Sequence, residues 1–408
     1  MIRDAEKIYT GAIKACLPDA TVEAALRDFE MPSGRLILVA IGKAAWKMAK
    51  KAHEILAEKI SLGIVITKYE HSEGKIGSLE IYEAAHPIPD ENGIKATKRA
   101  LSLTENLTEK DTVLFLVSGG GSALFECPVM SLSELSALTK KLLASGADIN
   151  EINAVRKHIS MVKGGRFAEH IAPAKVFAVA LSDVLGNSLD IIASGPCTAD
   201  SSTSEDVISI LQKYSIKLSD EVLAYIKQET PKNIENATHF IGGSVTELCL
   251  AAKKISEDLG YKAEILCDNE TGEARLLGER LAQLARKKSG TDTPLAFIVG
   301  GETVVKLKGA GLGGRNQETA LAAAKGISAL SNVLIFSVGS DGTDGPTDAA
   351  GAYVNGESFE KMKSEGIDPV FALENNDSYN ALGKIGNLII TGPTGTNVND
   401  VAVLLIRP

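Results

Sequence analysis

The sequence lacks any apolar run close to the ~18 residues that a transmembrane helix needs. It also lacks the apolar core of a secretory signal near its start, where Asp4, Glu6 and Lys7 stand instead. A membrane-spanning chain and a secreted chain are therefore both disfavoured. We expect a cytoplasmic protein with no membrane partner.

Cysteine is scarce and shows neither a disulfide pattern nor a zinc-binding pattern. The chain has five cysteines, an odd number, and no pair has CxxC spacing. A disulfide framework and a zinc site are therefore both disfavoured. We expect reduced, buried thiols at Cys16, Cys127, Cys197, Cys249 and Cys267.

Positive charge is outweighed by negative charge. The chain has 43 Lys and Arg against 52 Asp and Glu, which gives a formal net charge of −9. This balance opposes a general role on nucleic acid or on an anionic membrane. A small anionic substrate would therefore need a local pocket of cations.

Two common nucleotide-binding motifs are also missing. Neither the P-loop, GxxxxGK[ST], nor the dinucleotide fingerprint, GxGxxG with a following acidic residue, occurs between a strand and a helix. A standard P-loop NTPase and a standard NAD(P)-dependent enzyme are both disfavoured by this absence.

What the sequence does contain is an alternation of short β-branched runs with helical stretches. The runs RLILVAIG, SLGIVITK, TVLFLVSG and AKVFAVALSDV are each followed by or end in glycine or polar residues. This alternation is typical of βαβ units and predicts an α/β fold with a Rossmann-like, doubly wound parallel sheet. The carboxyl ends of such strands lie at one edge, where helix N-termini also point. We expect a ligand-binding cleft at that edge.

The length indicates more than one domain. A chain of 408 residues with 44 % hydrophobic content is too long for one ordinary core. The stretch KQETPKNIENATHF has the proline, charge and amide content of a connector. We predict a Rossmann-like domain over residues 1–235 and a second α/β domain over residues 236–408. Paired short strands in the second half favour a mixed sheet there.

Glycine clusters follow several of the predicted strands. The segments VSGGGSALF, FIGGSV and IVGGET each place glycines and hydroxyl or acidic residues after an apolar run. Backbone N–H groups in such loops can approach phosphate oxygens closely. A tight strand-to-helix turn is the alternative for any one cluster. The predicted nucleotide-binding residues are Ser118, Gly119, Gly120, Gly121, Ser122, Gly242, Gly243, Ser244, Gly300, Gly301, Glu302 and Thr303.

Two cations stand in unusual positions. Lys43 follows a strand and Gly42 at the mouth of a helix, where a positive charge opposes the helix dipole by a few tenths of a kcal/mol. A role on an anion explains this placement, and a solvated lysine is the alternative. Arg315 is flanked by glycines in GLGGRNQE, and its planar fork can hold a carboxylate or phosphate at two points.

A basic run, NAVRKHISMVKGGRFAEH, lies inside this acidic chain. Such runs usually form a solvated helix face, but Gly164 and Gly165 interrupt this one and can turn part of it toward an anion. The predicted substrate-binding residues are therefore Arg156, Lys163 and Arg166, together with Arg315. We interpret His158 as a structural histidine.

The segment SVGSDGTDGPTDAAG places three aspartates on a glycine-rich backbone directly after an apolar run. With Asp183, the residues Asp341, Asp344 and Asp348 are candidates to hold a metal ion or to orient a hydroxyl group. The alternative is a pair of Asp-Gly turns, in which the aspartates cap their own backbone. We expect one or two of the three to do only that.

In order along the chain, GKAAWKM, VSGGGSAL, NAVRKHIS, LSDVLGN with IASGP, GGET, GLGGRNQE and SDGTDGPTDAAGA resemble the class II glycerate 2-kinase family. This family has an N-terminal Rossmann-like domain and a C-terminal MOFRL domain, with the active site in the cleft between them. The resemblance covers nearly the whole chain. The chain departs from the family pattern at Asn187, where an acidic residue is usual, and at Cys197 and Thr198.

The resemblance implies transfer of the ATP γ-phosphoryl group to the 2-hydroxyl of D-glycerate, with Mg²⁺ and with 2-phosphoglycerate as product. It places the functional lysine and arginine at Lys43 and Arg315. Asp183 or Asp341 would orient the hydroxyl, and the metal ligands would be Asp183, Asp341 and Asp344.

Other functions stay open at this point. A hydroxypyruvate reductase that uses NAD(P)H is the enzyme alternative, and a non-catalytic protein that binds small anions is the other. The expected partners are D-glycerate and ATP, with no nucleic acid and no membrane. The sequence leaves a homodimer open.

Overall fold

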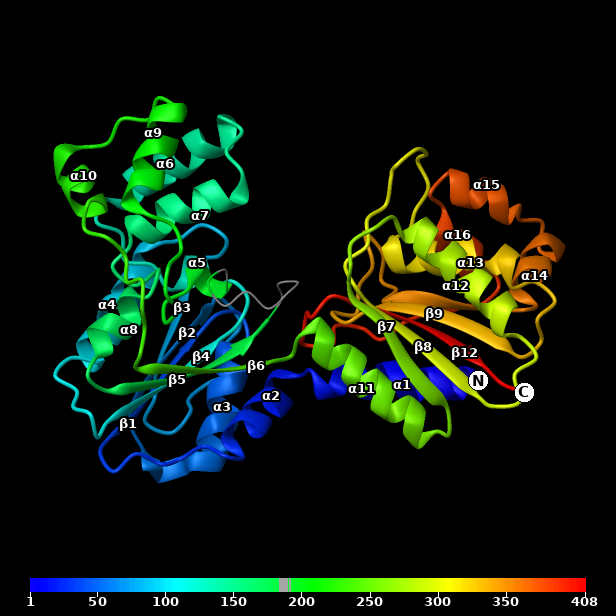
Figure 1. Ribbon diagram of the computed structural model, residues 1–408, viewed down its shortest axis with the longest axis horizontal. Helices are drawn as coiled ribbons and strands as arrows, with labels where there is room; N and C mark the ends of the chain where they lie inside the picture. The colour runs from blue at the N-terminus through cyan, green and yellow to red at the C-terminus, as the bar shows by residue number, and fades with distance from the viewer. Residues whose placement is uncertain (183–189, 191) are drawn as a thin grey trace. The chain divides into compact units, whose positions relative to one another are not determined.

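The computed structural model describes residues 1–182, 190 and 192–408, which form two compact units. The parallel-sheet unit is Pro18–Gly242, and the mixed-sheet unit combines Met1–Leu17 with Gly243–Pro408. Figure 1 follows the chain by colour from its first residue to its last. Within the described ranges, no helix combines the length and the apolar character that crossing a bilayer requires.

The parallel-sheet unit holds a six-stranded sheet in the order β3-β2-β1-β4-β5-β6, with every neighbouring pair parallel. The strands are β1 Leu36–Ile41, β2 Ile60–Lys68, β3 Glu80–Ala84, β4 Thr112–Val117, β5 Lys175–Leu181 and β6 Ala237–Gly242. At its carboxyl end, Ile41 of β1 pairs with Ile66 of β2 and with Val117 of β4. Three neighbouring strands therefore end at the same edge.

The apolar runs form central strands because helices cover both faces of this sheet. In β1, Val39 is buried against one face and Leu38 against the other, and both are fully inaccessible. Burying a side chain of this size contributes about 1.5–3 kcal/mol. The flanking helices are α2 Pro18–Leu26, α3 Ala45–Leu56, α4 Glu91–Leu103 and α8 Arg166–Ile171.

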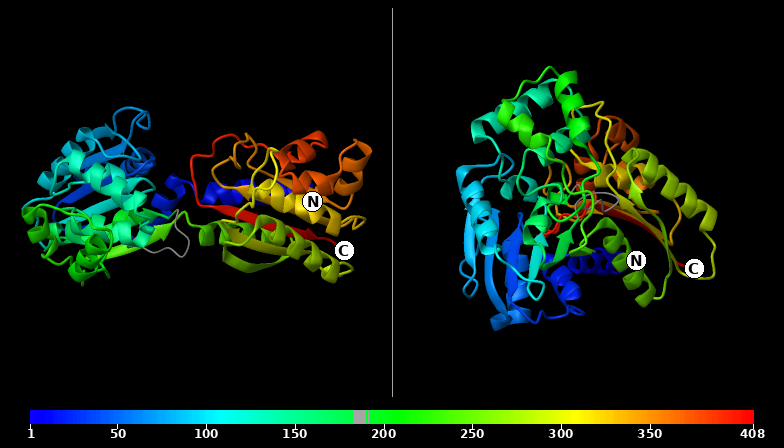
Figure 2. Two further views of the ribbon diagram at one scale, coloured as in Figure 1. Left: turned by 90° about the horizontal axis from the view of Figure 1, so that it is seen from above. Right: turned by 60° about the vertical axis from the view of Figure 1, so that its left-hand side comes forward.

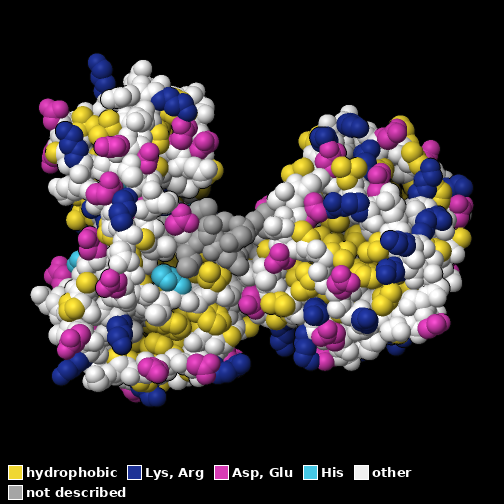
Figure 3. Space-filling view, viewed as in Figure 1, with side chains coloured by type: hydrophobic (Ala, Val, Ile, Leu, Met, Phe, Trp, Pro, Cys, Tyr) yellow, Lys and Arg dark blue, Asp and Glu magenta, His cyan; other side chains and the backbone are white. Residues whose placement is uncertain are grey.

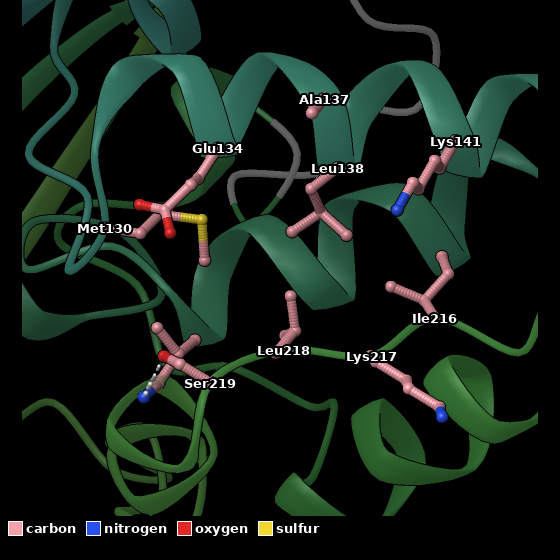
Figure 4. Close-up of a pocket in the computed structure, with 10 residues that line it drawn as sticks. Met130, Glu134, Ala137, Leu138, Lys141, Ile216, Lys217, Leu218 and Ser219 are labelled. Carbon is pink, nitrogen blue, oxygen red and sulfur yellow. Dashed lines mark hydrogen bonds between the residues drawn. The ribbon is translucent and has the colours of Figure 1, made fainter.

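Four further helices of this unit form a small cluster with an apolar core of its own (Figure 1). They are α6 Leu132–Ala144, α7 Ile149–His158, α9 Ser204–Lys213 and α10 Asp220–Ile226. Capping boxes begin three of them, at Ser131, Asp148 and Thr203, and each cap is worth about 1 kcal/mol. This cluster lines a cavity of about 160 Å³ between α6 and the segment before α10 (Figure 4).

The mixed-sheet unit holds a second six-stranded sheet in the order β11-β10-β9-β12-β8-β7, in which β7 and β8 run parallel and the other pairs antiparallel. The strands are β7 Lys262–Glu270, β8 Leu295–Gly301, β9 Val333–Gly339, β10 Gly351–Asn355, β11 Leu388–Ile389 and β12 Asp400–Ile406. Every residue of β9 and of β12 is buried. This burial explains why both segments are predominantly apolar in the sequence.

Helices also cover both faces of the second sheet. The helices α12 Ala274–Lys288 and α13 Arg315–Gly326 pack on the face that carries Phe297 and Ile335. On the other face lie α1 Ile2–Ala15 and α11 Val245–Asp258, where the ring of Tyr9 meets Phe336 edge-on at 5.9 Å. The short helices α14 Ser358–Ser364, α15 Pro369–Glu374 and α16 Ser378–Lys384 complete the unit.

The two ends of the chain meet in the mixed-sheet unit. Asp4 accepts hydrogen bonds from the Tyr261 hydroxyl at 2.7 Å and from Arg407 Nη2 at 3.0 Å. Figure 2 shows the two termini near each other in both views. These contacts explain why the first helix belongs to the second unit.

The predicted fold class, two α/β domains with one parallel and one mixed sheet, is confirmed. The division of the chain differs from the predicted 1–235 and 236–408 in two respects. The first unit continues to Gly242, because β6 pairs with β5 through Ala237 and Val176. The first 17 residues join the second unit. The five cysteines are free thiols, and four of them are buried.

The surface of each unit mixes both signs of charge over the face seen in Figure 3. Hydrophobic side chains gather over β7 and α12 of the mixed-sheet unit, where Leu266 and Leu276 are exposed.

Candidate active site

The order of the parallel sheet singles out one position at its edge. Along the chain, the strands are added outward from β1 in one direction and outward from β4 in the other. Open α/β sheets bind ligands outside the carboxyl ends of the strands at such a reversal. The turn after β1 carries Lys43, and the turn after β4 carries the predicted residues from Ser118 to Ser122.

Hydrogen bonds fasten these two turns to each other. The Lys43 N–H donates to the Gly119 carbonyl at 2.9 Å. The Ser118 hydroxyl accepts from the Ala44 N–H at 3.0 Å and donates to the Ile41 carbonyl at 3.3 Å. Gly42 has φ of +111°, and a Cβ there would lie 2.3 Å from Ser118 Oγ. Ser118 is buried and is used by the fold.

The Lys43 side chain, by contrast, is exposed. No Asp or Glu of the described residues forms an ion pair with its ammonium, whose stem passes beside Gly120. The glycine turn continues into the one-turn helix α5, Gly121–Leu124. The switch point therefore presents a cation and a glycine-rich backbone together, which is the chemistry that an oxyanion requires.

The predicted substrate-binding cations of the basic run point into the protein. Lys163 is fully inaccessible, and its Nζ donates to the Ser122 and Phe125 carbonyls at 2.8 Å each. It also lies 3.1 Å from Glu126 Oε2. Burial lowers the pKa of Lys163 to about 8, against the opposing effect of Glu126. Arg156 Nη2 donates to the same Ser122 carbonyl at 3.1 Å.

Arg166 is also engaged, farther along the same run. Its Nη2 donates to the Gln228 carbonyl at 2.8 Å, and its guanidinium lies over the ring of Tyr225 at 4.7 Å. His158 is buried and bonds to the Ala154 carbonyl at 3.0 Å. Arg156 and Lys163 therefore brace the glycine turn from behind, and His158 has the position of a structural histidine.

A second group of predicted residues lies at one edge of the mixed sheet. Asp400 begins β12 and pairs with Gly301 of β8 and Gly339 of β9. Arg315 begins α13, and its Nε and Nη2 donate to the two Asp400 oxygens at 2.5 and 3.1 Å. Burial alone would lower the pKa of Arg315, but the Asp400 carboxylate raises it above the ordinary value. Arg315 Nη1 lies 3.7 Å from Glu302.

The three aspartates of the glycine-rich segment differ in their contacts. Asp344 is buried and caps α13, because its oxygens accept the N–H groups of Asn316 at 3.1 Å and Gln317 at 2.8 Å. Burial raises the pKa of Asp344 to about 6. Asp341 accepts the Thr343 N–H at 3.0 Å in a local turn. Asp348 is exposed and accepts from the Tyr379 hydroxyl at 2.7 Å.

The remaining glycine clusters are packed tightly by their own units. A Cβ at Gly300 would lie 2.3 Å from the Cys249 sulfur, and a Cβ at Gly301 would lie 2.1 Å from the Glu270 carbonyl oxygen. Ser244 follows Gly242 and Gly243 and caps α11 by accepting the Glu247 N–H at 3.2 Å. The fold alone therefore accounts for glycine at positions 300 and 301. Glu302 is half exposed and Thr303 is buried.

The described residues contain no group of three or more His, Cys, Asp and Glu side chains that could hold a metal ion. Of the predicted ligands, Asp344 already accepts hydrogen bonds through both oxygens. Asp341 accepts through Oδ1, which leaves its second oxygen without a partner among residues 1–182, 190 and 192–408. Asp183, and also Asn187, lie outside the described residues.

Sequence reasoning missed Asp400, the residue that fixes the Arg315 fork. The available signal was a single acidic residue at the head of the apolar run DVAVLLI, after the polar stretch GTNVN. It also missed His86, which follows β3 and lies beside Gly120 and Lys43. Its signal was a lone histidine in AAHPIPD, which local spacing does not connect to either glycine turn.

Two family profiles match the chain. A domain of unknown function, DUF4147, matches residues 4–227, and the MOFRL family matches residues 295–400. Together they span both units.

Individual relatives agree over nearly the full length. The D-glycerate 2-kinase of Thermotoga maritima is 53 % identical, over 98 % of this chain and 97 % of the relative. The crystal structure of the glycerate kinase from T. maritima superposes with a TM-score of 0.92 over 99 % of both chains, at 53 % identity. A protein of Agrobacterium vitis, provisionally named a hydroxypyruvate reductase, is 39 % identical over 98 % of this chain and 93 % of its own. From these matches, the chain belongs to the class II glycerate 2-kinase family.

Proposed function

We propose that this protein is an ATP-dependent glycerate 2-kinase, which transfers the γ-phosphoryl group of ATP to the 2-hydroxyl of D-glycerate. The observation that carries the proposal is the exposed Lys43, whose backbone N–H bonds to Gly119 and whose side-chain stem lies beside Gly120, at the switch point of the parallel sheet. Phosphoryl transfer spreads negative charge over oxygen atoms, and a fixed cation with backbone donors stabilises that charge. The family membership supports the same reaction.

In the parallel-sheet unit, the Gly119–Ser122 turn would approach phosphate oxygens, and Lys43 would neutralise charge in the transition state. Arg156 and Lys163 would act on the substrate through the backbone, because both donate to the Ser122 carbonyl. Such bracing keeps the turn in one geometry, so that no reorganisation is needed when charge develops.

In the mixed-sheet unit, Arg315 would contact an anionic group through Nη1, since Nε and Nη2 are held by Asp400. Asp341, or Asp183, would accept the proton of the 2-hydroxyl. The Gly242–Ser244 and Gly300–Thr303 segments remain proposed nucleotide contacts, although the contacts described above also give them structural roles.

A divalent cation, when bound, would supply further positive charge to the ATP phosphates. Mg²⁺ commonly takes only one or two protein carboxylates and keeps water and phosphate oxygens as its other ligands. Asp341, with one oxygen free of described partners, fits that requirement, while Asp344 does not. The metal is therefore proposed to arrive with ATP rather than to occupy a cage of side chains.

A hydroxypyruvate reductase is the alternative enzyme, because some relatives carry that name. It would need a nicotinamide site, and the sequence has no dinucleotide fingerprint between a strand and a helix. A non-catalytic anion-binding protein would use Lys43 and the glycine turn but would have no need of Asp341.

The test is product analysis by ³¹P NMR after incubation with D-glycerate, ATP and MgCl₂. We expect signals of ADP and 2-phosphoglycerate, and neither signal when glycerate or ATP is omitted. A parallel sample with EDTA reports the metal requirement. Exclusive formation of 3-phosphoglycerate would correct the regiochemistry, and oxidation of NADH on addition of hydroxypyruvate, without phosphoryl transfer, would replace the kinase by the reductase.

A further inference from the structure

His86 lies against both elements of the switch-point turn. It follows β3, the outer strand beyond β2. A Cβ built on Gly120 would lie 3.0 Å from His86 Cδ2, 3.1 Å from His86 Nε2 and 3.2 Å from Lys43 Cγ. The Nε2 edge of the imidazole and the Lys43 stem therefore flank the same glycine.

The ring of His86 makes no hydrogen bond to any residue in the described part of the chain. Four other histidines, His71, His158, His170 and His239, each bond to a backbone carbonyl oxygen at 2.9–3.0 Å, while the Nδ1 of His53 also has no partner among the described residues. An imidazole that is only half-buried and bonds to no described residue can still offer one N–H donor and one acceptor.

The surroundings of His86 favour the neutral form of its imidazole. Burial lowers its pKa, and the nearby positive charges of Lys43 and Lys68 lower it further. Lys68 ends β2, and His71 Nδ1 lies 2.9 Å from the Lys43 carbonyl oxygen. Basic groups from the ends of β1 and β2 therefore gather around the imidazole that follows β3.

We infer that His86 and Lys43 form one oxyanion subsite, in which His86 Nε2–H donates to a substrate oxygen and Lys43 supplies the charge. This inference rests on the proposed kinase function and adds a substrate-binding residue to it. The oxyanion is either the carboxylate of glycerate or a phosphate group of ATP, since both present the same kind of acceptor. A neutral donor fixes the direction of the oxygen without adding a third cation to the lysines.

Steady-state kinetics of His86→Ala and His86→Gln separate these two sources. Loss of one hydrogen bond to a charged group should raise the KM for one substrate about tenfold or more, with kcat changed less than threefold. A higher KM for D-glycerate alone assigns the carboxylate, and a higher KM for ATP alone assigns a phosphate. The Gln side chain keeps an N–H donor near the position of Nε2, so His86→Gln should recover part of the loss.

His170→Gln is the matched control, because His170 lies in the same unit and bonds to the Leu101 carbonyl. Its KM values should equal those of the wild type. Unchanged KM values in both His86 variants would overturn the inference. A lower melting temperature together with higher KM values for both substrates in both variants would overturn it too. That result would mean that His86 serves the packing of the fold.

A binding measurement separates this inference from the proposed function. The ring signals of ¹⁵N-histidine-labelled protein are followed by NMR during titration with inorganic phosphate and, separately, with D-glycerate, and His86→Gln identifies the signal. A shift of the His86 signal in a protein without kinase activity would support the subsite and refute the kinase. An active kinase whose His86 signal responds to neither probe nor to ATP would refute the subsite alone.

Discussion

The two units use charge at their strand ends in opposite ways. In the parallel-sheet unit, Lys43 has no ion-pair partner among the described residues, and the nearest basic groups add to its charge. In the mixed-sheet unit, Arg315 is held at two points by Asp400, and Asp344 caps the helix that Arg315 begins. The cation at the first edge is unpaired, and the cation at the second edge is paired with a carboxylate of its own unit.

If the proposed function is correct, this difference separates a cation that serves only a ligand from one that serves the fold as well. An unpaired cation at a helix mouth costs a few tenths of a kcal/mol, and nothing else described in the unit compensates that cost. A buried carboxylate such as Asp400 would by contrast cost about 3–5 kcal/mol if its partner were removed. We therefore expect changes at Lys43 to lower activity alone, and changes around Asp400 to lower stability as well.

The largest effect is expected for Lys43→Ala. Removal of one preorganised charge-stabilising group should lower kcat by about 10²- to 10³-fold, while the melting temperature stays within about 1 °C of the wild type because no ion pair is lost. The measurement is kcat by coupled assay together with thermal melting. Lys47→Ala is the control and should not change the activity, because Lys47 is an exposed lysine on α3, the helix that follows the Lys43 turn. A fully active Lys43→Ala enzyme would contradict the assignment.

Asp341→Asn is the corresponding change at the mixed sheet. Asparagine keeps the oxygen that accepts the Thr343 N–H, so the turn should persist, but the charge for a proton or a metal ion is lost. We expect kcat to fall about 10²-fold with little change in melting temperature. Kinetics at several MgCl₂ concentrations show which role is lost, because loss of a metal ligand would raise the Mg²⁺ concentration that the enzyme needs. If Asp341→Asn keeps normal kinetics, the aspartate is only a turn residue.

Arg315→Lys should have a smaller effect on rate and a visible effect on stability. An ammonium group cannot contact both Asp400 oxygens and still present a donor beside Glu302, so kcat/KM should fall about tenfold. Asp400 stays partly paired, and the melting temperature should fall by a few degrees. Near-normal kinetics combined with a lower melting temperature would mean that Arg315 serves the fold alone.

Local sequence pattern located the two glycine turns of the parallel-sheet unit but not the Arg315–Asp400 pair of the mixed-sheet unit. The turns after β1 and β4 follow directly from apolar runs that end in glycine, so Lys43 and the Ser118–Ser122 turn could be placed from the sequence. The Arg315 fork meets a carboxylate 85 positions away, because β12 inserts between β8 and β9. No spacing rule anticipates that insertion.

The basic run shows the same limit in a different form. The sequence NAVRKHISMVKGGR suggests a cationic surface, but the Lys163 side chain is buried and donates to the carbonyls of Ser122 and Phe125. A lysine can be buried only where several oxygens compensate its desolvation. Whether a position provides them depends on where the glycine turn passes, which is a tertiary property.

The smallest effect, and the sharpest test of the structural role of Asp344, is a pH dependence of the difference in stability between the wild type and Asp344→Asn. Burial raises the pKa of Asp344 to about 6 in the folded protein, above about 3.9 in the unfolded chain. Since the folded pKa is raised, the stabilising contribution of the protonated carboxyl is fully present below about pH 4 and is lost as pH rises through about 6. The loss amounts to about 2–3 kcal/mol by pH 7.5. Asparagine does not titrate, so Asp344→Asn cannot show this loss of stability as the pH rises.

The free energy of unfolding of the wild type and of Asp344→Asn should therefore converge as pH rises. At pH 4.5 the protonated Asp344 carboxyl stabilises the wild type, a contribution that asparagine lacks, so the variant should be less stable there, with a smaller gap at pH 7.5. Urea titrations at five pH values measure this gap. Asp348→Asn is the control, because Asp348 is exposed, and its gap to the wild type should stay near zero throughout. A constant gap for Asp344→Asn would show that this carboxylate is charged in the fold at every pH tested, and the residue would then return as a candidate metal ligand beside Asp341.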